Sequence, residues 1–453
     1  MEVEAWLARA ARARPAHTAV ATPAGEWSYA QLHAAARSGA RELAARGATR
    51  GARVAIALPA GLELAQSLHA CFALGAIAVP VDLRLADGER AQIAEGAAVL
   101  VDEPLARAGE HDDLDRSSVP DGGVHDLDAT AVVIHTSGTT AAPRPVALTY
   151  GNILWSALGS AVALGLDPEE RWLCTLPLSH VGGLSILLRS AIYATSAVVH
   201  ERFETERVLD TLRAGEATLV SLVATTLARL LDAGLRHPPT LRCALTGGGP
   251  VPAALVRRAH DAGVPVSLTY GLTESCSQAT TTPVAALSPE GEIARAPASA
   301  GTPLFCTRLR IAADGEILVA GPTVAPAALA SDGWLHTGDL GELDEQGRLR
   351  VSGRKADTIV SGGENVAPAE VEAVLESHAA VLEAAVLGRE DPHWGEAVTA
   401  IVVARVGERL DAEALRAHCA GSLAPYKVPK HFVLASEPLP RTRSGKLLRR
   451  ELR

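Results

Sequence analysis

Lysine is scarce in this chain. Only four of the 453 residues are lysines, against 38 arginines, and all four lie in the last hundred residues: Lys355, Lys427, Lys430 and Lys446. An excess of Ala and Arg is typical of a GC-rich genome, in which arginine serves wherever any cation will do. We interpret a retained lysine as a mild indication that its compact ammonium matters, although chance retention at an exposed position is the simpler explanation for any one of them.

Cysteine clusters and long apolar runs are also missing. The six cysteines, at positions 71, 174, 243, 276, 306 and 419, form no CxxC pair, which excludes a zinc cluster and indicates reduced thiols in the cytoplasm. No run of about 18 uncharged apolar residues occurs, so we expect no membrane span. The nearest approach, residues 184–199, contains Arg189. The acidic start of the chain argues against a signal peptide.

Positive charge is in deficit as well. The formal net charge of −10 argues against a nucleic-acid-binding protein, and we expect small-molecule partners instead. At 453 residues the chain is long for one core and predicts two or more domains. The sequence does not reveal the oligomeric state, and a homodimer is compatible with it.

Helical and strand patterns alternate along most of the chain. We expect helices at about 29–46, 62–75 and 152–165, an apolar helix around Arg189, and strands at 54–58, 77–81, 131–134, 173–176, 197–200, 218–223, 243–245 and 266–270. Residues 102–128 read as a surface loop. This rhythm predicts an α/β fold with a large N-terminal domain of mostly parallel sheets and helices on both faces.

The pattern changes in the last third of the chain. Residues 299–352 consist of short strands and turns, which predicts a small β-rich subdomain, and a small α+β unit follows. We therefore divide the chain into a large domain over residues 1–352, a boundary at 353–357 and a C-terminal domain over 358–453.

A loop of small hydroxyl residues follows the apolar run 131–134. It reads His135-Thr136-Ser137-Gly138-Thr139-Thr140, with Arg144 close behind. Gly138 lets the backbone come near an anion, and the flanking hydroxyls donate hydrogen bonds to phosphate oxygens. Alone, such a segment is usually a solvated loop, so its meaning depends on the motifs that accompany it.

Three further motifs carry chemistry. Tyr270-Gly271-Leu272-Thr273-Glu274 follows an apolar strand, where α/β sheets bind ligands, and offers a ring, a hydroxyl and a carboxylate. Thr337-Gly338-Asp339 places a carboxylate after a glycine turn, suited to the hydroxyls of a ribose. Residues 441–446 place Lys446 on a flexible loop that lacks the GxxxxGK[ST] pattern. Each motif alone is equally explained as a strand-end turn, a helix cap or a solvated tail.

In this order the motifs resemble the acyl-adenylate-forming enzymes, which include acyl- and aryl-CoA ligases, adenylation domains and luciferases. The resemblance covers essentially the whole chain and extends to two further segments: Gly353-Arg354-Lys355-Ala356-Asp357, and Ser361-Gly362-Gly363-Glu364-Asn365-Val366-Ala367-Pro368-Ala369-Glu370-Val371-Glu372. It implies that a carboxylic acid is activated with ATP and Mg²⁺ as an acyl-adenylate, from which coenzyme A displaces AMP.

The resemblance also implies residue roles. By this resemblance the ligands of the leaving phosphates are Thr136, Ser137, Gly138, Thr139, Thr140 and Arg144. The residues that line the adenine are Gly247, Gly248, Gly249, Tyr270 and Gly271, and those that hold the ribose are Asp339 and Arg354. Thr273 is assigned to the α-phosphate and Glu274 to Mg²⁺. Lys446 bridges the carboxylate and the α-phosphate, and a mobile C-terminal domain turns about residues 355–357 to bring Gly362 and Gly363 to the pantetheine tunnel.

Within the family, residues 176–185, Arg189 and residues 246–250 most resemble ligases for an aromatic keto-acid with two carboxylates. The resemblance places His180 at the gate of the acid pocket as a catalytic residue. It also implies that Arg189 faces the second carboxylate of the acid. A buried guanidinium on an apolar helix needs either such an anion or a route to solvent. Ser277 and Gln278 add donors to the same wall.

The chain departs from the family pattern in two places. The phosphate loop usually reads TSGTTGxPKG, and here Ala141, Arg144 and Pro145 replace Gly, Lys and Gly. Ala disfavours a positive φ, and Pro fixes its own φ and restricts the backbone of the residue before it, so we expect a stiffer loop. At the hinge, Ala356 stands where a charged or polar residue is common.

Two alternatives stay open at this point. One is a ligase for another aryl or acyl acid, or an enzyme that loads a carrier protein. The other is a non-catalytic nucleotide-binding relative, which the altered phosphate loop motivates and which the presence of Lys446, Glu274 and Asp339 opposes.

Overall fold

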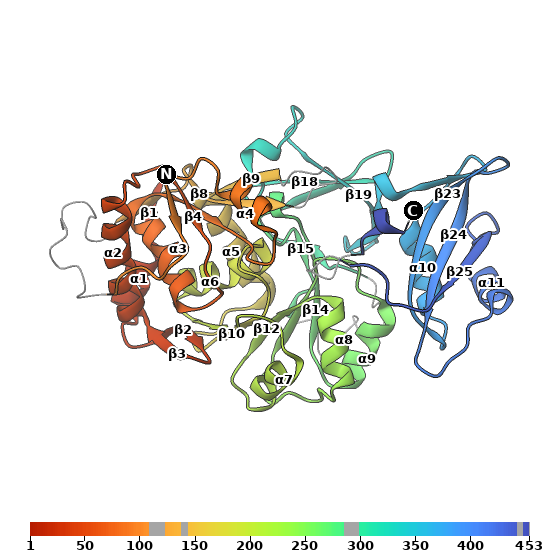
Figure 1. Ribbon diagram of the computed structural model, residues 1–453, viewed down its shortest axis with the longest axis horizontal. Coiled ribbons are helices and arrows are strands. Elements are labelled where there is room, and N and C mark those ends of the chain that lie inside the picture. Colours follow the sequence, from red (N-terminus) through yellow and green to blue (C-terminus); the bar gives the residue numbers. More distant parts are fainter. Residues whose placement is uncertain (108–122, 137–143, 285–298, 442–446, 453) are drawn as a thin grey trace.

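The computed structural model describes residues 1–107, 123–136, 144–284, 299–441 and 447–452 (Figure 1). Its largest sheet has nine strands, in the order β16 (Thr302–Pro303), β15 (Thr280–Thr281), β14 (Val266–Tyr270), β13 (Cys243–Thr246), β12 (Leu219–Leu222), β10 (Arg171–Cys174), β11 (Ser196–Val199), β2 (Thr18–Thr22) and β3 (Gly25–Ser28). The strands from β14 to β2 run parallel, and the outer strands β15, β16 and β3 are antiparallel to their neighbours.

A second sheet has five strands, in the order β6 (Val99–Val101), β4 (Arg53–Ile56), β5 (Ile77–Pro80), β8 (Thr130–Thr136) and β9 (Arg144–Thr149). Only the pairing of β8 with β9 is antiparallel. A short antiparallel pair joins β1 (Glu2–Glu4) to β7 (Val124–Asp126). Strand β7 lies where the sequence predicts only loop, because a three-residue run without apolar alternation carries no strand signal.

Helices fill the space between the two sheets and cover their outer faces. The central layer contains α1 (Trp6–Ala13), α2 (Tyr29–Ala45), α3 (Leu62–Leu74), α5 (Tyr150–Leu164) and α6 (Val181–Tyr193), which share one hydrophobic core with strands of both sheets. Helix α4 (Asp87–Ala94) covers the outside of the smaller sheet, and α7 (Thr205–Arg213), α8 (Ala224–Asp232) and α9 (Ala253–Asp261) cover the outside of the larger one. The expected α/β fold with mostly parallel sheets is confirmed.

Local sequence signals explain where the central helices begin and end. Ser28 and Gln31 form a capping box at the start of α2, and Thr149 and Asn152 form another at the start of α5. Helix α3 ends at Gly75, whose φ of 74° lies in the left-handed region that glycine adopts most easily. The predicted helix bounds at 29–46, 62–75 and 152–165 are therefore correct to within two residues.

Two smaller sheets follow. The antiparallel sheet of β17 (Arg308–Ile311), β18 (Glu316–Ala320), β19 (Leu335–Leu343) and β20 (Leu349–Arg354) is the β-rich part expected for residues 299–352. After the 3-10 turn η6 (Lys355–Asp357), a separate sheet combines β22 (Glu364–Val366), β21 (Ile359–Ser361), β24 (Gly395–Ala404) and β23 (Val381–Asp391), with β25 (His431–Ala435) parallel to β24. Helices α10 (Pro368–Glu376) and α11 (Ala412–Ala420) pack on one face of it.

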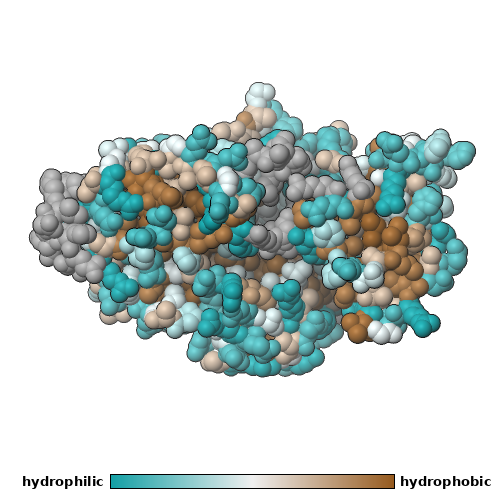
Figure 2. Space-filling view, in the orientation of Figure 1, coloured by the Kyte–Doolittle hydropathy of each residue, from teal (hydrophilic) through white to brown (hydrophobic). Residues whose placement is uncertain are grey.

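The other face of this C-terminal sheet is only partly covered. Figure 2 shows an apolar area over this part of the molecule. Val433, which pairs with Ile401 of this face, is 38% exposed. Leu439, Leu447 and Leu452 pack on the same face together with residues of β23 and β24. The residues on both sides of segment 442–446 are thus attached to the C-terminal sheet.

Two buried histidines, His69 on α3 and His125 on β7, lie in one aromatic cluster. His125 stacks on Tyr150 with 4.3 Å between ring centroids, and His69 meets Phe72 edge-on at 5.8 Å. Burial lowers the pKa of His69 to about 4 and that of His125 to about 3. Both rings are therefore neutral in the native state.

These histidines predict a loss of stability in mild acid. An unfolded histidine takes up a proton near pH 6.5 while the buried ring does not, so stability is full above pH 7 and is lost as the pH falls from 6.5 toward 4. We expect His69 alone to cost about 2 kcal/mol at pH 5. Urea unfolding at pH 7.5 and pH 5 tests this. His69→Gln should lose less stability than wild type between the two pH values, and His260→Gln, with an exposed ring, should behave as wild type. An unchanged loss in His69→Gln would contradict the assignment.

In the described part of the chain, no helix is long and apolar enough to cross a membrane.

Candidate active site

Loops at the carboxyl ends of parallel strands hold some of the predicted site residues. Strand β13 leads into Gly247, Gly248 and Gly249, and β14 leads into Gly271. A Cβ at Gly247 would lie 2.7 Å from the carbonyl oxygen of Thr269, so only glycine lets these two loops approach each other. Gly248 has a φ of 79°, in the left-handed region. This edge of the sheet is where open α/β sheets bind ligands.

The hydroxyl loop lies between β8 and β9. Thr136 ends β8 and pairs with Arg144, and its hydroxyl donates to the Arg144 carbonyl at 3.3 Å. Pro145 pairs with His135 in the same ladder. Residues 137–143, which include the predicted phosphate ligands Ser137, Gly138, Thr139 and Thr140 and the substituted Ala141, lie outside the described residues.

A hydrogen-bonded trio joins the strand β14 to the antiparallel sheet. The Tyr270 hydroxyl donates to Asp339 Oδ2 at 2.8 Å, and Arg354 Nε lies 2.6 Å from Asp339 Oδ1. Asp339 and Arg354 face each other across β19 and β20, and Asp339 is 5% exposed. Burial raises the pKa of Tyr270, and the neighbouring Asp339 adds to this shift, so the phenol stays a donor. The structure thus brings Tyr270 together with Asp339, which lies 69 positions later in the sequence, and with Arg354 beyond it.

The segment after Gly271 is tightly wound. A Cβ at Gly271 would lie 1.7 Å from the Ser277 carbonyl oxygen, and Cys276 and Ser277 adopt φ values of 54° and 89°. Left-handed backbone at two consecutive non-glycine residues is costly and clusters at functional sites. The 3-10 turn η2 (Thr273–Ser275) holds Thr273 and Glu274 at this point and contacts β9, the strand that follows the hydroxyl loop.

Glu274 fits the predicted role of a magnesium ligand. Its side chain is half-buried, and among the described residues no hydrogen bond or ion pair engages its carboxylate. An unengaged carboxylate suits a hard cation that prefers oxygen ligands. The described residues hold no cluster of three or more metal-ligating side chains.

His180 stands at the start of α6, next to a bidentate ion pair. Its Nε2 lies 3.3 Å from Arg84 Nη2 and 3.7 Å from Asp82 Oδ2. Asp82 accepts from Arg84 Nε at 2.8 Å and from Nη2 at 2.6 Å. Burial lowers the pKa of His180, although Asp82 opposes the shift. The imidazole is therefore neutral at neutral pH and is oriented by residues of another loop, which the sequence gives no means of predicting.

Arg189 is buried on α6 without a carboxylate partner in the described residues. It is 2% exposed, and its Nη2 donates to Ser156 Oγ at 3.1 Å. Its guanidinium stacks on Trp172 at 5.5 Å, and its Nε meets no acceptor. Ser156 in turn donates to the Cys276 carbonyl at 2.6 Å. The guanidinium therefore keeps donor capacity that the described residues do not use.

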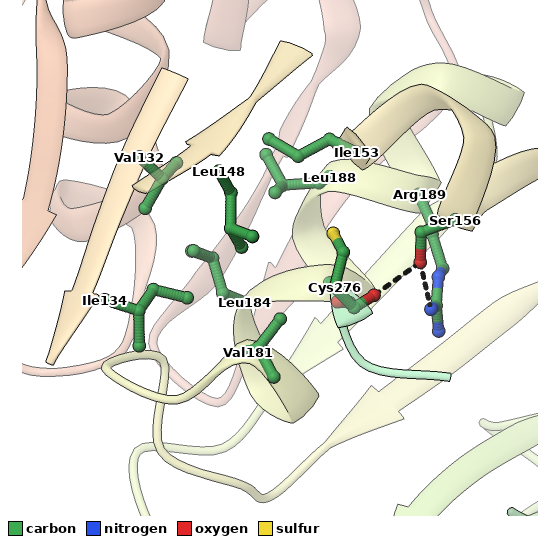
Figure 3. A pocket seen from close by; sticks show the side chains of 11 residues that line it. Val132, Ile134, Leu148, Ile153, Ser156, Val181, Leu184, Leu188, Arg189 and Cys276 are labelled. Atoms are coloured by element: carbon green, nitrogen blue, oxygen red, sulfur yellow. Dashed lines mark hydrogen bonds between the residues drawn. The ribbon is translucent and has the colours of Figure 1, made fainter. Parts of the chain in front are cut away.

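This guanidinium closes one end of an apolar pocket (Figure 3). The pocket is lined by Val132, Ile134, Leu148, Ile153, Ser156, Val181, Leu184, Ser185, Leu188, Arg189 and Cys276. Figure 3 shows Arg189 and Ser156 at one end and Val132 and Ile134, on β8, at the other. Because β8 continues into the hydroxyl loop and Val181 follows His180, the pocket leads away from the predicted reaction centre.

Sequence analysis missed two residues of this pocket. Ser156 and Cys276 contact each other and lie beside Arg189, and a small polar residue on a helix that also carries Asn152 and Ser160 gives no sequence signal of a site. Ser277 and Gln278, which we predicted as donors in the acid wall, are not among the residues that line the pocket. The Gln278 side chain is buried and donates to Thr281 Oγ1 at 2.7 Å.

The boundary segment is tied to both sides. Lys355 Nζ lies 2.6 Å from Asp314, in the turn before β18, and 3.3 Å from Glu316, the first residue of β18, and the hydrogen bond to Asp314 raises the pKa of Lys355. Beyond it, Gly362 and Gly363 form the turn between β21 and β22 with φ values of 62° and 86°. A Cβ at Gly362 would lie 3.1 Å from the Trp394 ring. Lys446 lies outside the described residues.

Comparison with known proteins decides the family. The AMP-binding enzyme family matches residues 7–327, and the AMP-binding enzyme C-terminal domain matches residues 370–446. The chain belongs to the AMP-binding enzyme family. The resemblance drawn from the ordered motifs is therefore confirmed, and the protein is an adenylate-forming enzyme of the acid–thiol ligase class.

Individual relatives match over nearly the whole chain. The 2-succinylbenzoate–CoA ligase of Bacillus subtilis (strain 168) is 40% identical over 481 residues, which cover 99% of this chain and 97% of the relative. The solved o-succinylbenzoate CoA synthetase of Bacillus subtilis with the acyl-adenylate intermediate OSB-AMP has a TM-score of 0.89 and 37% identity, with 100% and 98% of the two chains covered. The same enzyme with ATP and a magnesium ion has a TM-score of 0.88 and 37% identity, with both chains covered completely.

Proposed function

We propose that this family member is a 2-succinylbenzoate–CoA ligase of menaquinone biosynthesis. The observation that carries this proposal is the buried Arg189 guanidinium, which has spare donors at the end of an apolar pocket. Full-length similarity to 2-succinylbenzoate–CoA ligases supports it. The lining of this pocket suits an aromatic acid with a second carboxylate, because apolar side chains favour the ring and the planar fork of an arginine favours the anion.

The reaction has two steps. The acid carboxylate first attacks the α-phosphate of ATP and releases pyrophosphate, and the CoA thiol then displaces AMP from the acyl-adenylate. Both substitutions are dominated by charge, so catalysis requires positioned cations and donors. Mg²⁺, when bound with ATP, neutralises phosphate charge.

The residue roles are proposed from motif order and supported by the geometry. Thr136 and Arg144 flank the hydroxyl loop assigned to the β- and γ-phosphates. Thr273 and Glu274 share η2, which suits contact with the α-phosphate and its cation. The Asp339 carboxylate, oriented by Tyr270 and Arg354, suits the two hydroxyls of a ribose.

The residues around the adenine and the entrance of the acid pocket complete the proposed site. Gly247, Gly248 and Gly249 offer a flat backbone surface for the adenine, opposite Tyr270 and Gly271. His180, at the mouth of the pocket that Arg189 closes, contacts the activated carboxylate. Lys446 places one positive charge between that carboxylate and the α-phosphate during adenylation.

We further propose that residues 358–453 rotate between the two steps. Lys355 is paired with the antiparallel sheet, whereas Asp357 is paired with Arg449 of the C-terminal region. Ala356 lies between these two ties and has no charged group of its own, so it suits a pivot. Rotation there exchanges Lys446 for Gly362 and Gly363 at the reaction centre. Because ATP and CoA are cytoplasmic co-substrates, we place the enzyme in the cytoplasm.

An acid panel tests the function. Acid-dependent exchange of labelled pyrophosphate into ATP should be strongest with 2-succinylbenzoate among aryl and fatty acids. Addition of CoA should then release AMP and consume the acid stoichiometrically. An enzyme that loads a carrier protein would exchange pyrophosphate without turning over on CoA, and a non-catalytic relative would bind nucleotide without any exchange.

The altered phosphate loop gives a separate prediction. Replacing Ala141, Arg144 and Pro145 together with Gly, Lys and Gly should change the KM for ATP or the rate of pyrophosphate release. Affinity for the acid should stay unchanged, because only the leaving phosphates contact this loop in the proposed site. Steady-state kinetics with each substrate varied in turn check this, and a shift in acid specificity would mean that the loop is wrongly assigned.

A further inference from the structure

The two chain segments that flank residues 442–446 lie side by side. Arg441 and Leu447 form an isolated antiparallel bridge, and the Leu448 amide donates to the Pro440 carbonyl at 2.9 Å. Leu447 also packs on the C-terminal sheet beside Leu439. The stem from which Lys446 emerges is therefore a defined structural unit, and Lys446 is one peptide away from its second strand.

Two glutamates, the half-buried Glu383 and the buried Glu372, hold this stem. Glu383 of β23 accepts from the Leu439 amide at 2.8 Å and from Arg441 Nη2 at 2.7 Å. Glu372 of α10, 9% exposed, accepts from Arg449 Nη1 at 2.5 Å and from Nη2 at 2.8 Å. Two parallel hydrogen bonds between a guanidinium and a carboxylate fix the relative orientation of the two groups as well as their distance.

Arg449 makes two more contacts that extend the network. Its Nη1 donates to the Val386 carbonyl at 2.8 Å, and its Nε lies 3.5 Å from Asp357 Oδ2 in the boundary turn η6. The Glu372 carboxylate also accepts from the Val386 amide at 2.7 Å. The Arg449 guanidinium thus joins the second chain segment of the stem to α10, to β23 and to the proposed pivot.

We propose that Arg449 is a positioning residue for adenylation, which fixes the Lys446 stem relative to the pivot through Glu372 and Asp357. This inference rests on the proposed role of Lys446 in the first step. If the stem were not held in place, the lysine would reach the α-phosphate in few of its conformations, and misplacement of a reacting group by 1 Å costs about a hundredfold in rate. The second step does not use Lys446, so it does not depend on Arg449.

Helix α10 offers a matched pair of substitutions. Glu372→Gln weakens the contact to Arg449, whereas Glu370→Gln weakens an ion pair of the same helix with Lys427, at 2.7 Å, that is not connected to the stem. Arg449→Ala removes the guanidinium outright, and Arg449→Lys keeps the charge but loses the fork. Each variant is assayed for pyrophosphate exchange and, separately, for CoA attack on supplied 2-succinylbenzoyl-adenylate.

We expect exchange to fall about a hundredfold in Arg449→Ala and about tenfold or more in Arg449→Lys and Glu372→Gln. CoA attack should stay within about threefold of wild type in all three, and Glu370→Gln should match wild type in both assays. Equal loss in both half-reactions, or unchanged exchange, would overturn the proposal. Lys446→Ala in the same series tests the proposed role of Lys446 separately from that of Arg449, because retained exchange in that variant contradicts the role of Lys446 itself. Glu372→Gln keeps the test informative if Arg449→Ala does not fold.

Discussion

Lys446→Ala is expected to slow adenylation by about a hundred- to a thousandfold and to leave CoA attack on supplied acyl-adenylate nearly unchanged. Loss of one charge positioned at the transition state costs roughly 3–4 kcal/mol. Lys446 follows a fixed stem on the C-terminal sheet, and we propose that this whole unit turns away before CoA attacks. Single-turnover assays of the two half-reactions measure the difference directly.

Another lysine of the same region gives the control. Lys427→Ala removes an ammonium that is paired with Glu370, and it should leave adenylation at the wild-type rate. Comparable losses in both half-reactions of Lys446→Ala would contradict the division of labour. In a chain with four lysines, the retention of Lys446 would then have no catalytic explanation.

Arg189→Ala is expected to raise the KM for 2-succinylbenzoate far more than the KM for ATP or CoA. The variant leaves a desolvated substrate carboxylate unpaired, which costs on the order of 2–5 kcal/mol, or about thirtyfold and upward. The preference for 2-succinylbenzoate over monocarboxylic benzoates should narrow by the same factor. Pyrophosphate exchange driven by each acid, in wild type and variant, measures both effects.

Two milder substitutions make this test specific. Arg189→Lys keeps the charge but loses the planar fork, so it should recover only part of the lost affinity. Ser156→Ala removes the hydroxyl that accepts from Arg189 and should have a smaller effect than loss of the guanidinium. An equal rise in the KM of all three substrates in Arg189→Ala would indicate a structural role for the residue instead.

The sequence predicted the parts of the fold that depend on local periodicity. Apolar runs separated by helical patterns were enough to place α2, α3 and most strands of the two parallel sheets. Strand β7 escaped because its three residues form a strand only by pairing with β1, more than a hundred residues away. Strand β10 ends at Cys174, two residues before the predicted end, because its ladder with β11 stops there.

Site residues could be predicted where a side chain does not suit the residues around it in the sequence. Arg189 was identifiable because a guanidinium on an apolar helix requires a partner, and the structure buries it at the end of a pocket. Ser156 and Cys276 were missed because small residues give no such signal. The contacts of Tyr270 with Asp339, and of Arg449 with Glu372, join segments that local pattern cannot connect.

Thioester formation from 2-succinylbenzoate, compared with benzoate, tests the central claim most directly. With purified enzyme, ATP, Mg²⁺ and CoA, the aryl-CoA product is quantified by mass while each acid is varied. The account predicts a kcat/KM for 2-succinylbenzoate at least about thirtyfold above that for benzoate, with AMP and thioester formed in equal amounts. An equal or higher kcat/KM for benzoate or for a fatty acid would contradict it.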